Sequence, residues 1–424
     1  MWAKESAPFK EIPVLDNGRI KPLDTYARNL LVQFSGKDTV DKKPAITWLA
    51  TVFFNVDQTR ADKIFLINNP DIAVALGIEA STHRRYSYND IEKSVPKLVE
   101  LAQAARNIQE KQRSIVENEI IRVLENLELY VDLSREFSFT QPAEDFNNSS
   151  FLDVALQSDD MARLMKDIEH VNEGQWSDKQ REVMALLTSL FHWSLTYKNL
   201  LLTLIPQQGS GVWLSPWDTI GKDFKNEQTR QLLKQWQKMS VSFKKGAQLE
   251  FDMAARQYLE LLYERLGKNE KKKVSRFSLE LLYNTSRPFL LAKVFYILTF
   301  IFFCISFMSK ARFWYSAAWA ALLLGFIPHL LALIARIIIM ARPPVSSLYE
   351  TFIFVSFIGV LLGILIERIN KQWIGIVTAS ISGAALLFIA SKYSAEGDTL
   401  KVLVAVLDSN FWLSTHVTSI TMGY

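Results

Sequence analysis

Hydrophobic and polar residues are distributed differently in the two parts of this chain. After residue 287, apolar residues form runs of about 20 residues, the length that spans the hydrocarbon core of a bilayer. We expect membrane-spanning helices over four of these runs, at 288–308, 313–340, 348–366 and 373–390. A fifth run begins near Phe411 and reaches Tyr424, which gives the start of a fifth span.

Before residue 288, apolar residues recur at three-to-four spacing within polar sequence, the pattern of amphipathic helices. Asp24 and Thr25 open one such run and Gly36 ends it, which predicts a capped helix with a glycine stop. We also predict a long helix or a hairpin over 90–137, a helix over 179–205, one or two helices over 226–266, and a surface loop over 141–150.

The fold class that follows is mainly α. We expect an extramembrane, mainly helical domain over 1–287, followed over 288–424 by a transmembrane bundle of four spans and the start of a fifth. Charge follows the same division. The first 287 residues hold 39 of the 48 Lys and Arg residues and 39 of the 44 Asp and Glu residues. The basic excess is therefore thin and lies in apolar sequence, which excludes a nucleic-acid binder.

The single cysteine, Cys304, excludes a disulfide framework, a CxxC redox site and a covalently attached c-type haem on this chain. Positive charge gathers in the short loops 309–312 and 367–372, and the positive-inside rule places these loops in the cytoplasm. The domain over 1–287 is then external. Because the first 30 residues contain no signal peptide, we expect further sequence upstream of residue 1.

Ionisable residues at membrane depth are candidates for function. His329 and Arg336 lie seven residues apart, on one face of the second span. They indicate a haem- or proton-handling histidine with an arginine toward the outer interface. The alternative is a histidine hydrogen-bonded between helices and an arginine that extends outward to the interface.

The turn after the second span is the next candidate region. Arg342, Pro343 and Pro344 break the helix, and Tyr349 and Glu350 open the next span. Glu350 lies in the first helical turn, where the helix dipole favours an acid. We expect these five residues to shape an external structural turn.

His416 lies at the outer mouth of the fifth apolar run, beside Phe411 and Trp412. An imidazole at the interface can bind haem iron while neighbouring aromatic rings contact the porphyrin. A purely structural histidine at a helix end is the alternative. The three histidines before residue 288 have no partners at metal-site spacing: His83, His170 and His192.

Three passages resemble a known family, the cytochrome c biogenesis protein CcsA and its fused form CcsBA. SSLYETFIFVSF, from Ser346, is similar to the start of a CcsA span, and VLDSNFWLSTHVTSITMGY, from Val406, to the family's external-histidine segment. PVLDNGRIKPLDTYAR, from Pro13, and the later LELLYNTSRPF resemble the extracytoplasmic stretch of CcsBA. The resemblance runs from Pro13 to Tyr424.

The resemblance implies a haem-handling component of the System II cytochrome c synthetase, in the bacterial inner membrane. His416 corresponds to the family's first external histidine, an axial haem ligand, with Trp412 and Phe411 around it. Haem b would be transported and held without covalent attachment to this chain. The implied partners are apocytochrome c with its CxxCH thiols, a CcsB-like accessory half and membrane lipid.

The chain also departs from the family pattern. It lacks the tryptophan-rich WGxxWxWDxxE segment, the second external histidine, the intramembrane histidine that follows it and the accessory half. We therefore expect an internal piece of a longer CcsBA-like polypeptide that is not a haem lyase by itself. His329 stays a candidate haem-binding residue by its depth alone, because it matches neither transmembrane ligand of the family. Two alternatives remain open: a membrane-anchored assembly scaffold without haem, and a transporter fragment that uses His329 and Arg336.

Overall fold

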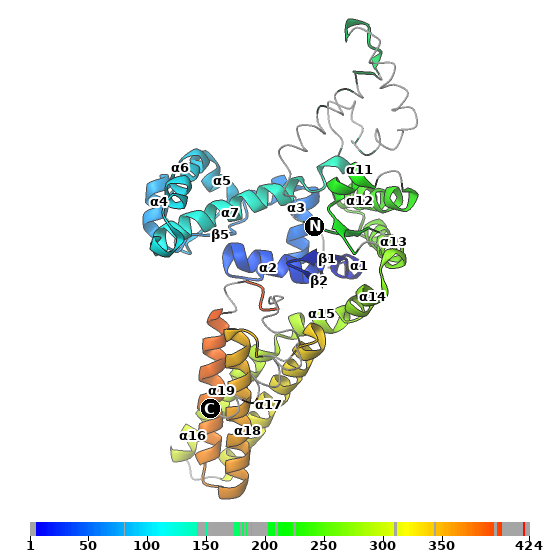
Figure 1. Cartoon of the computed structure of the whole chain (residues 1–424). Helices are drawn as coiled ribbons and strands as arrows, with labels where there is room; N and C mark the ends of the chain where they lie inside the picture. The colour runs from blue at the N-terminus through cyan, green and yellow to red at the C-terminus, as the bar shows by residue number, and fades with distance from the viewer. Residues whose placement is uncertain are drawn as a thin grey trace. The chain divides into compact units, whose positions relative to one another are not determined.

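The computed structural model describes most of the chain in two compact units. The described residues are 6–79, 81–141, 202–207, 211–223, 226–308, 312–342, 345–393 and 397–400, with a few short stretches between 150 and 188 and at 419. The first unit comprises residues 1–271 and the second residues 272–424 (Figure 1). The structure is mainly helical, as the sequence predicts.

The first unit begins with a short helix, a tight hairpin and a longer helix. They are α1 (Ala7–Lys10), β1 (Pro13–Asp16), β2 (Arg19–Pro22) and α2 (Leu23–Ser35). The hairpin turns at Asn17 and Gly18, which both have positive φ, at 49° and 75°. Such a pair favours the two-residue turn that matches the twist of antiparallel strands. The predicted stop of α2 is confirmed, because Gly36 adopts the left-handed conformation, with φ 71°.

Of the two alternatives for 90–137, a long helix or a hairpin, the structure has the hairpin, formed by α6 (Val95–Arg106) and α7 (Ile115–Arg135). Ser114 and Glu117 form a capping box at the start of α7, so the local sequence fixes where this helix begins. Two helices fill the predicted region 226–266, α12 (Glu227–Lys245) and α13 (Gln248–Arg265), and Gly246 separates them. Most of the expected helix over 179–205 and most of the expected loop over 141–150 lie outside the described residues. The end of that expected helix is wrong, because residues 202–205 are extended: Thr203 forms a bridge with Leu15, and Ile205 begins β7 (Ile205–Pro206).

The other elements of this unit are short helices and two-residue strand pairs. They are β3 (Thr39–Val40), β4 (Lys43–Pro44), α3 (Ala45–Phe54), β5 (Phe65–Leu66), α4 (Pro70–Leu76), β6 (Arg85–Tyr86), α5 (Tyr88–Ile91), β7 (Ile205–Pro206), β8 (Trp213–Leu214) and α11 (Pro216–Lys222). α14 (Lys268–Val274) carries the chain from the first unit to the second.

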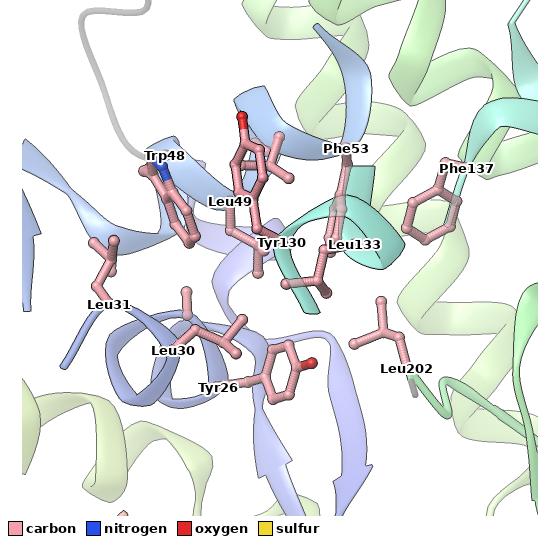
Figure 2. Packing of buried hydrophobic residues seen from close by; sticks show 14 of the residues in the cluster. Tyr26, Leu30, Leu31, Trp48, Leu49, Phe53, Tyr130, Leu133, Phe137 and Leu202 are labelled. Carbon is pink, nitrogen blue, oxygen red and sulfur yellow. The ribbon is translucent and has the colours of Figure 1, made fainter. Parts of the chain in front are cut away.

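Many aromatic side chains lie in the core of the first unit. Phe137, just after α7, stacks on Trp236 of α12 with ring centroids 4.0 Å apart. Figure 2 shows Phe53 and Phe137 close to aliphatic residues of the same cluster, such as Leu133 and Leu202. Burial of these large side chains supplies the main stabilisation of the unit, at about 25 cal/mol per Å² of apolar surface.

Glu136 is one of the buried carboxyl groups of the first unit. Glu136, between α7 and Phe137, is 1% exposed, and its Oε1 atom has no hydrogen-bond partner among the described residues. Burial raises the pKa of Glu136 well above its ordinary value, and the neighbouring carboxylates of Asp132 and Asp218 raise it further. The raised pKa links the stability of this unit to pH.

Replacing Glu136 with glutamine is expected to stabilise the first unit at neutral pH. A raised folded-state pKa gives stability that is complete below the unfolded pKa of about 4.3 and is lost as pH rises through the folded value. Glu136→Gln removes this loss, so its advantage grows from pH 4 to pH 8 toward about 1–3 kcal/mol. Thermal unfolding of the detergent-solubilised chain, followed by tryptophan fluorescence, measures it. Glu128→Gln, at an exposed position of α7, is the control; equal pH profiles for the two variants would refute the prediction.

The described residues of the second unit form four long apolar helices. They are α16 (Pro288–Met308), α17 (Arg312–Met340), α18 (Leu348–Asn370) and α19 (Ile374–Tyr393) (Figure 1). All four are long and apolar enough to cross a membrane, so the four expected spans are confirmed and the chain is a multi-pass membrane protein. The expected fifth span, 411–424, lies outside the described residues apart from Ser419.

A short helix, α15 (Phe277–Ser286), precedes the first span and belongs to the second unit. Arg276, at its start, donates a hydrogen bond to the carbonyl of Ile339, and Leu279 and Tyr283 pack against Ala335 and Ile339 of α17. Because of these contacts the second unit begins at residue 272, ahead of the first apolar run.

Small residues bring the spans close together. The ring of Tyr296, on α16, is fully buried between Gly325 of α17 and Gly383 of α19. A Cβ atom at either glycine would lie under 3 Å from this ring. Gly363 of α18 faces Gly375 of α19 in the same way, so these two backbones nearly touch. Small residues at helix crossings are typical of membrane bundles, where close packing replaces the hydrophobic effect.

Candidate functional site

Two groups of buried polar side chains lie along α17. His329, in the middle of this helix, is fully buried. Its Nε2 atom lies 3.2 Å from the carbonyl oxygen of Ile353 on α18, and its Nδ1 atom 3.0 Å from the hydroxyl of Tyr296 on α16. A carbonyl only accepts, so we assign the hydrogen to Nε2, and Nδ1 of the neutral ring then accepts from Tyr296. His329 thus links three spans.

Aromatic rings enclose the same imidazole. Phe289 of α16 and Phe357 of α18 meet it edge to face, with ring centroids 5.6 and 5.7 Å away. Both ring nitrogens of His329 are engaged within the bundle, so neither is free to bind iron in this structure. The geometry is that of the histidine hydrogen-bonded between helices.

Arg336 lies two turns further along α17 and is 1% exposed. Its Nη2 atom lies 2.8 Å from Oε1 of Glu350, which is also 1% exposed, and 2.6 Å from the carbonyl oxygen of Thr399. Its Nη1 atom donates to the hydroxyls of Tyr283, at 3.2 Å, and Thr399, at 3.4 Å. The alternative of an arginine that extends outward to the interface is therefore wrong, because Arg336 turns into a buried ion pair.

Glu350 has more contacts than the expected external turn requires. Its backbone N–H donates to Ser347 at the start of α18, as expected for a residue in the first helical turn. Its Oε2 atom also accepts from the backbone N–H of Ser346, and its Oε1 atom lies 3.5 Å from a guanidinium nitrogen of Arg342. Glu350 therefore ties the turn between α17 and α18 to Arg336.

The remaining residues of the turn lie in different environments. The guanidinium carbon of Arg336 lies 5.0 Å from the centre of the Tyr349 ring, a distance typical of a cation–π contact. The side chain of Arg342 is 14% exposed. Pro343 and Pro344 lie outside the described residues, as do His416, Trp412 and Phe411.

The short segment 397–400, after α19, completes the polar cluster around Arg336. Leu400 is 3% exposed and packs with Ala335 and Ile339 of α17. Its backbone N–H donates to the carboxylate of Asp398, at 2.8 Å, which makes a local turn. The described chain after α19 is thus fixed beside Arg336 at residues 399 and 400.

A second buried carboxylate lies at the other end of α18. The sequence placed Glu367 at the start of a loop, but α18 continues to Asn370 and Glu367 is fully buried. It accepts hydrogen bonds from the hydroxyl of Tyr315, at 2.9 Å, and from the backbone N–H groups of Trp373 and Gly375, at 3.0 and 3.1 Å. These contacts cap the start of α19. Because they satisfy the buried carboxylate of Glu367, α18 continues past its apolar run to Asn370.

Sequence reasoning missed the partners of the two intramembrane residues: Tyr283, Tyr296, Glu350 as an ion-pair partner, and Thr399. One signal was available. A buried charge in a membrane is normally paired, and Glu350 follows Arg336 across a single turn between two spans. The other partners come from elements distant in sequence, which spacing along one helix does not reveal.

Comparison with known proteins gives a match of low identity along most of the chain. No family model matches the chain. The chain is similar to Protein NrfI of Wolinella succinogenes, with 23% identity over 412 residues. These residues cover 96% of this chain, and the chain spans 38% of the relative's length.

Proposed function

We propose that this chain is the haem-handling part of a System II cytochrome c synthetase of the CcsA or CcsBA type. It holds haem b at the external face of the bacterial inner membrane for delivery and attachment to apocytochrome c. The observation that carries the proposal is the passage VLDSNFWLSTHVTSITMGY, which begins at Val406, after the four apolar helices described above, and contains His416. The broad similarity to Protein NrfI supports the same process.

His416 is the proposed axial ligand of the haem iron, with Trp412 and Phe411 as its aromatic surroundings. Among the described residues of the bundle, the one imidazole is His329, and both of its nitrogens are engaged. The donor set of the bundle interior therefore does not fit an iron site, and we assign His329 no role as a ligand. This leaves His416 as the ligand for which the sequence offers the right donor.

The proposal also includes partners and an orientation. Apocytochrome c, with its CxxCH thiols, is the acceptor of the haem, and a CcsB-like half supplies the spans and ligands that this chain does not carry. The first unit lies on the external side of the membrane together with the turn at Arg342. In this arrangement the first unit is exposed to the compartment in which c-type cytochromes mature.

Absorption spectroscopy of the purified membrane protein tests the haem assignment. The parent chain is expected to carry haem with a Soret band, and His416→Gly is expected to lose at least about nine-tenths of that band or change its position, because a haem without its axial ligand binds weakly. His83→Gly is the matched control, since His83 is exposed in the first unit. Added imidazole should restore the parent spectrum to His416→Gly.

Two outcomes contradict the proposal. A parent protein that binds no haem when produced with excess haem would favour the membrane-anchored assembly scaffold. A His416→Gly variant with the haem content and spectrum of the parent would leave the protein as a haem carrier but refute the ligand.

A further inference from the structure

Three parts of the second unit that are distant in sequence meet at one guanidinium group. Arg336 of α17 contacts Tyr283 of α15, Glu350 of α18 and Thr399, beyond α19. Two nitrogen atoms, Nη1 and Nη2, carry four N–H bonds, and four acceptor atoms of these three residues lie within 3.4 Å of them. This number of matched acceptors indicates that the position requires an arginine.

The contact with Thr399 differs from the others because it holds main chain. Nη2 lies 2.6 Å from the Thr399 carbonyl oxygen, and no substitution of the Thr399 side chain can remove this acceptor. A charged donor in a water-poor site makes a stronger hydrogen bond than a neutral one. Leu400, buried against Ala335 and Ile339, adds an apolar contact at the same point. Residues 399 and 400 are therefore fixed to α17 by the hydrogen bonds from Arg336 and by the apolar contact of Leu400.

Glu350 determines where the guanidinium lies. It is held at the start of α18 by the backbone N–H of Ser346, and it shares Nη2 of Arg336 with the Thr399 carbonyl. A planar guanidinium can reach both acceptors at once because its N–H bonds diverge at fixed angles. A lysine ammonium keeps the charge but not this geometry. The ion pair thus supports the contact between Arg336 and the main chain at Thr399.

We propose that Arg336 is a positioning residue for the haem-ligating segment: with Glu350 as its support, it anchors Thr399 and Leu400, from which the chain continues to His416, 17 residues later. The inference rests on the proposed function for the role of His416. The anchor itself is a property of the described residues and is measured without haem. Its consequence is that Arg336 controls the ligation of haem without touching it.

Hydrogen exchange of the haem-free, full chain in detergent tests the anchor. Arg336→Lys keeps the charge opposite Glu350 but loses the reach to the Thr399 carbonyl. We expect the amides of residues 397–400 to exchange about tenfold faster than in the parent, with the middle of α17 unchanged. Arg368→Lys is the matched control, because Arg368 is exposed near the end of α18. Thr399→Val, which removes only the 3.4 Å contact, should change the exchange little.

A second variant keeps the test independent of how well one mutant folds. Glu350→Gln retains the shape of the side chain but removes the charge that holds Arg336, so it should also expose residues 397–400. Size-exclusion chromatography and far-UV circular dichroism identify the folded variants. If a folded Arg336→Lys or Glu350→Gln protein protects residues 397–400 as well as the parent does, the anchor is refuted.

Haem spectra separate this inference from the proposed function. In haem-loaded protein, Arg336→Lys should shift the Soret band toward the spectrum of His416→Gly, and added imidazole should reverse the shift. If the parent binds no haem, the proposed function fails while the exchange experiment still decides the anchor. If exchange rises but the haem spectrum stays that of the parent, the anchor exists and its role in positioning His416 is refuted.

Discussion

Replacing Glu350 with alanine is expected to destabilise the membrane bundle by about 3–5 kcal/mol, the usual effect of removing one partner of a buried ion pair. Arg336 would keep its charge while 1% exposed, next to neutral hydroxyl and carbonyl groups and the ring of Tyr349. Arg342, 3.5 Å from the same carboxylate, would lose that contact as well. The cost comes from an uncompensated charge in a medium that solvates it poorly.

Replacing both partners separates this cost from loss of packing. Arg336→Met combined with Glu350→Leu fills a similar volume without charge, and we expect it to regain most of the stability that Glu350→Ala loses. Unfolding by SDS in mixed micelles, followed by far-UV circular dichroism, measures both variants, with Arg368→Ala as a control at an exposed position. A double variant as unstable as Glu350→Ala would show that the ion pair itself stabilises the bundle and refute the argument from charge.

The double variant also tests how stability relates to the anchor. It should restore the bundle but leave residues 397–400 as exposed as in Arg336→Lys, because no guanidinium reaches the Thr399 carbonyl. Buried ion pairs often stabilise little compared with apolar residues, so a role in placing a segment explains better why this one is present. The ion pair then contributes more to the position of residues 399 and 400 than to the stability of the bundle.

The spans were predictable because their signal is carried by long runs of a single property. The expected bounds 288–308 coincide with those of α16, and the expected start of the third span at Leu348 is that of α18. The largest error is at the end of α18. Hydropathy falls at Glu367, whereas the helix continues because that carboxylate is buried and caps α19. Hydropathy averaged along the sequence does not predict a contact between two helices.

The same limit applies to the candidate site. His329 and Arg336 were found from their depth in an apolar run, which is a property of one helix. Their partners lie on α15, α16, α18 and the segment 397–400, and the direction of Arg336 is set by Glu350 and Thr399. Considered as a lone helix, α17 allows the arginine to extend outward, and only the packed bundle excludes it.

In the first unit, Asn17 and Gly18 were a hairpin signal in the sequence that the prediction of a helical domain left out.

Small residues show most directly what hydropathy cannot predict, since a glycine in a span can be neutral or essential. Gly363→Ala is expected to cost about 1–3 kcal/mol, the usual range for overpacking, because its Cβ would lie 2.6 Å from the carbonyl oxygen of Gly375 and 2.7 Å from Cβ of Ala379. Backbone atoms cannot rotate away, so α18 and α19 must separate. Separation would also lengthen the contact between Glu367 and the Gly375 N–H, now 3.1 Å.

Gly359→Ala is the matched control on the same helix. Its Cβ would meet mainly the Ser382 hydroxyl, at 2.9 Å, and a hydroxyl can turn aside where a carbonyl of the main chain cannot. We therefore expect Gly359→Ala to cost less than half as much. The fraction of protein that stays monodisperse on size-exclusion chromatography after heating in detergent ranks the variants. Equal losses for the two alanine variants would mean that the α18–α19 crossing tolerates a wider spacing, and that Gly363 is no more critical than an ordinary small residue in a span.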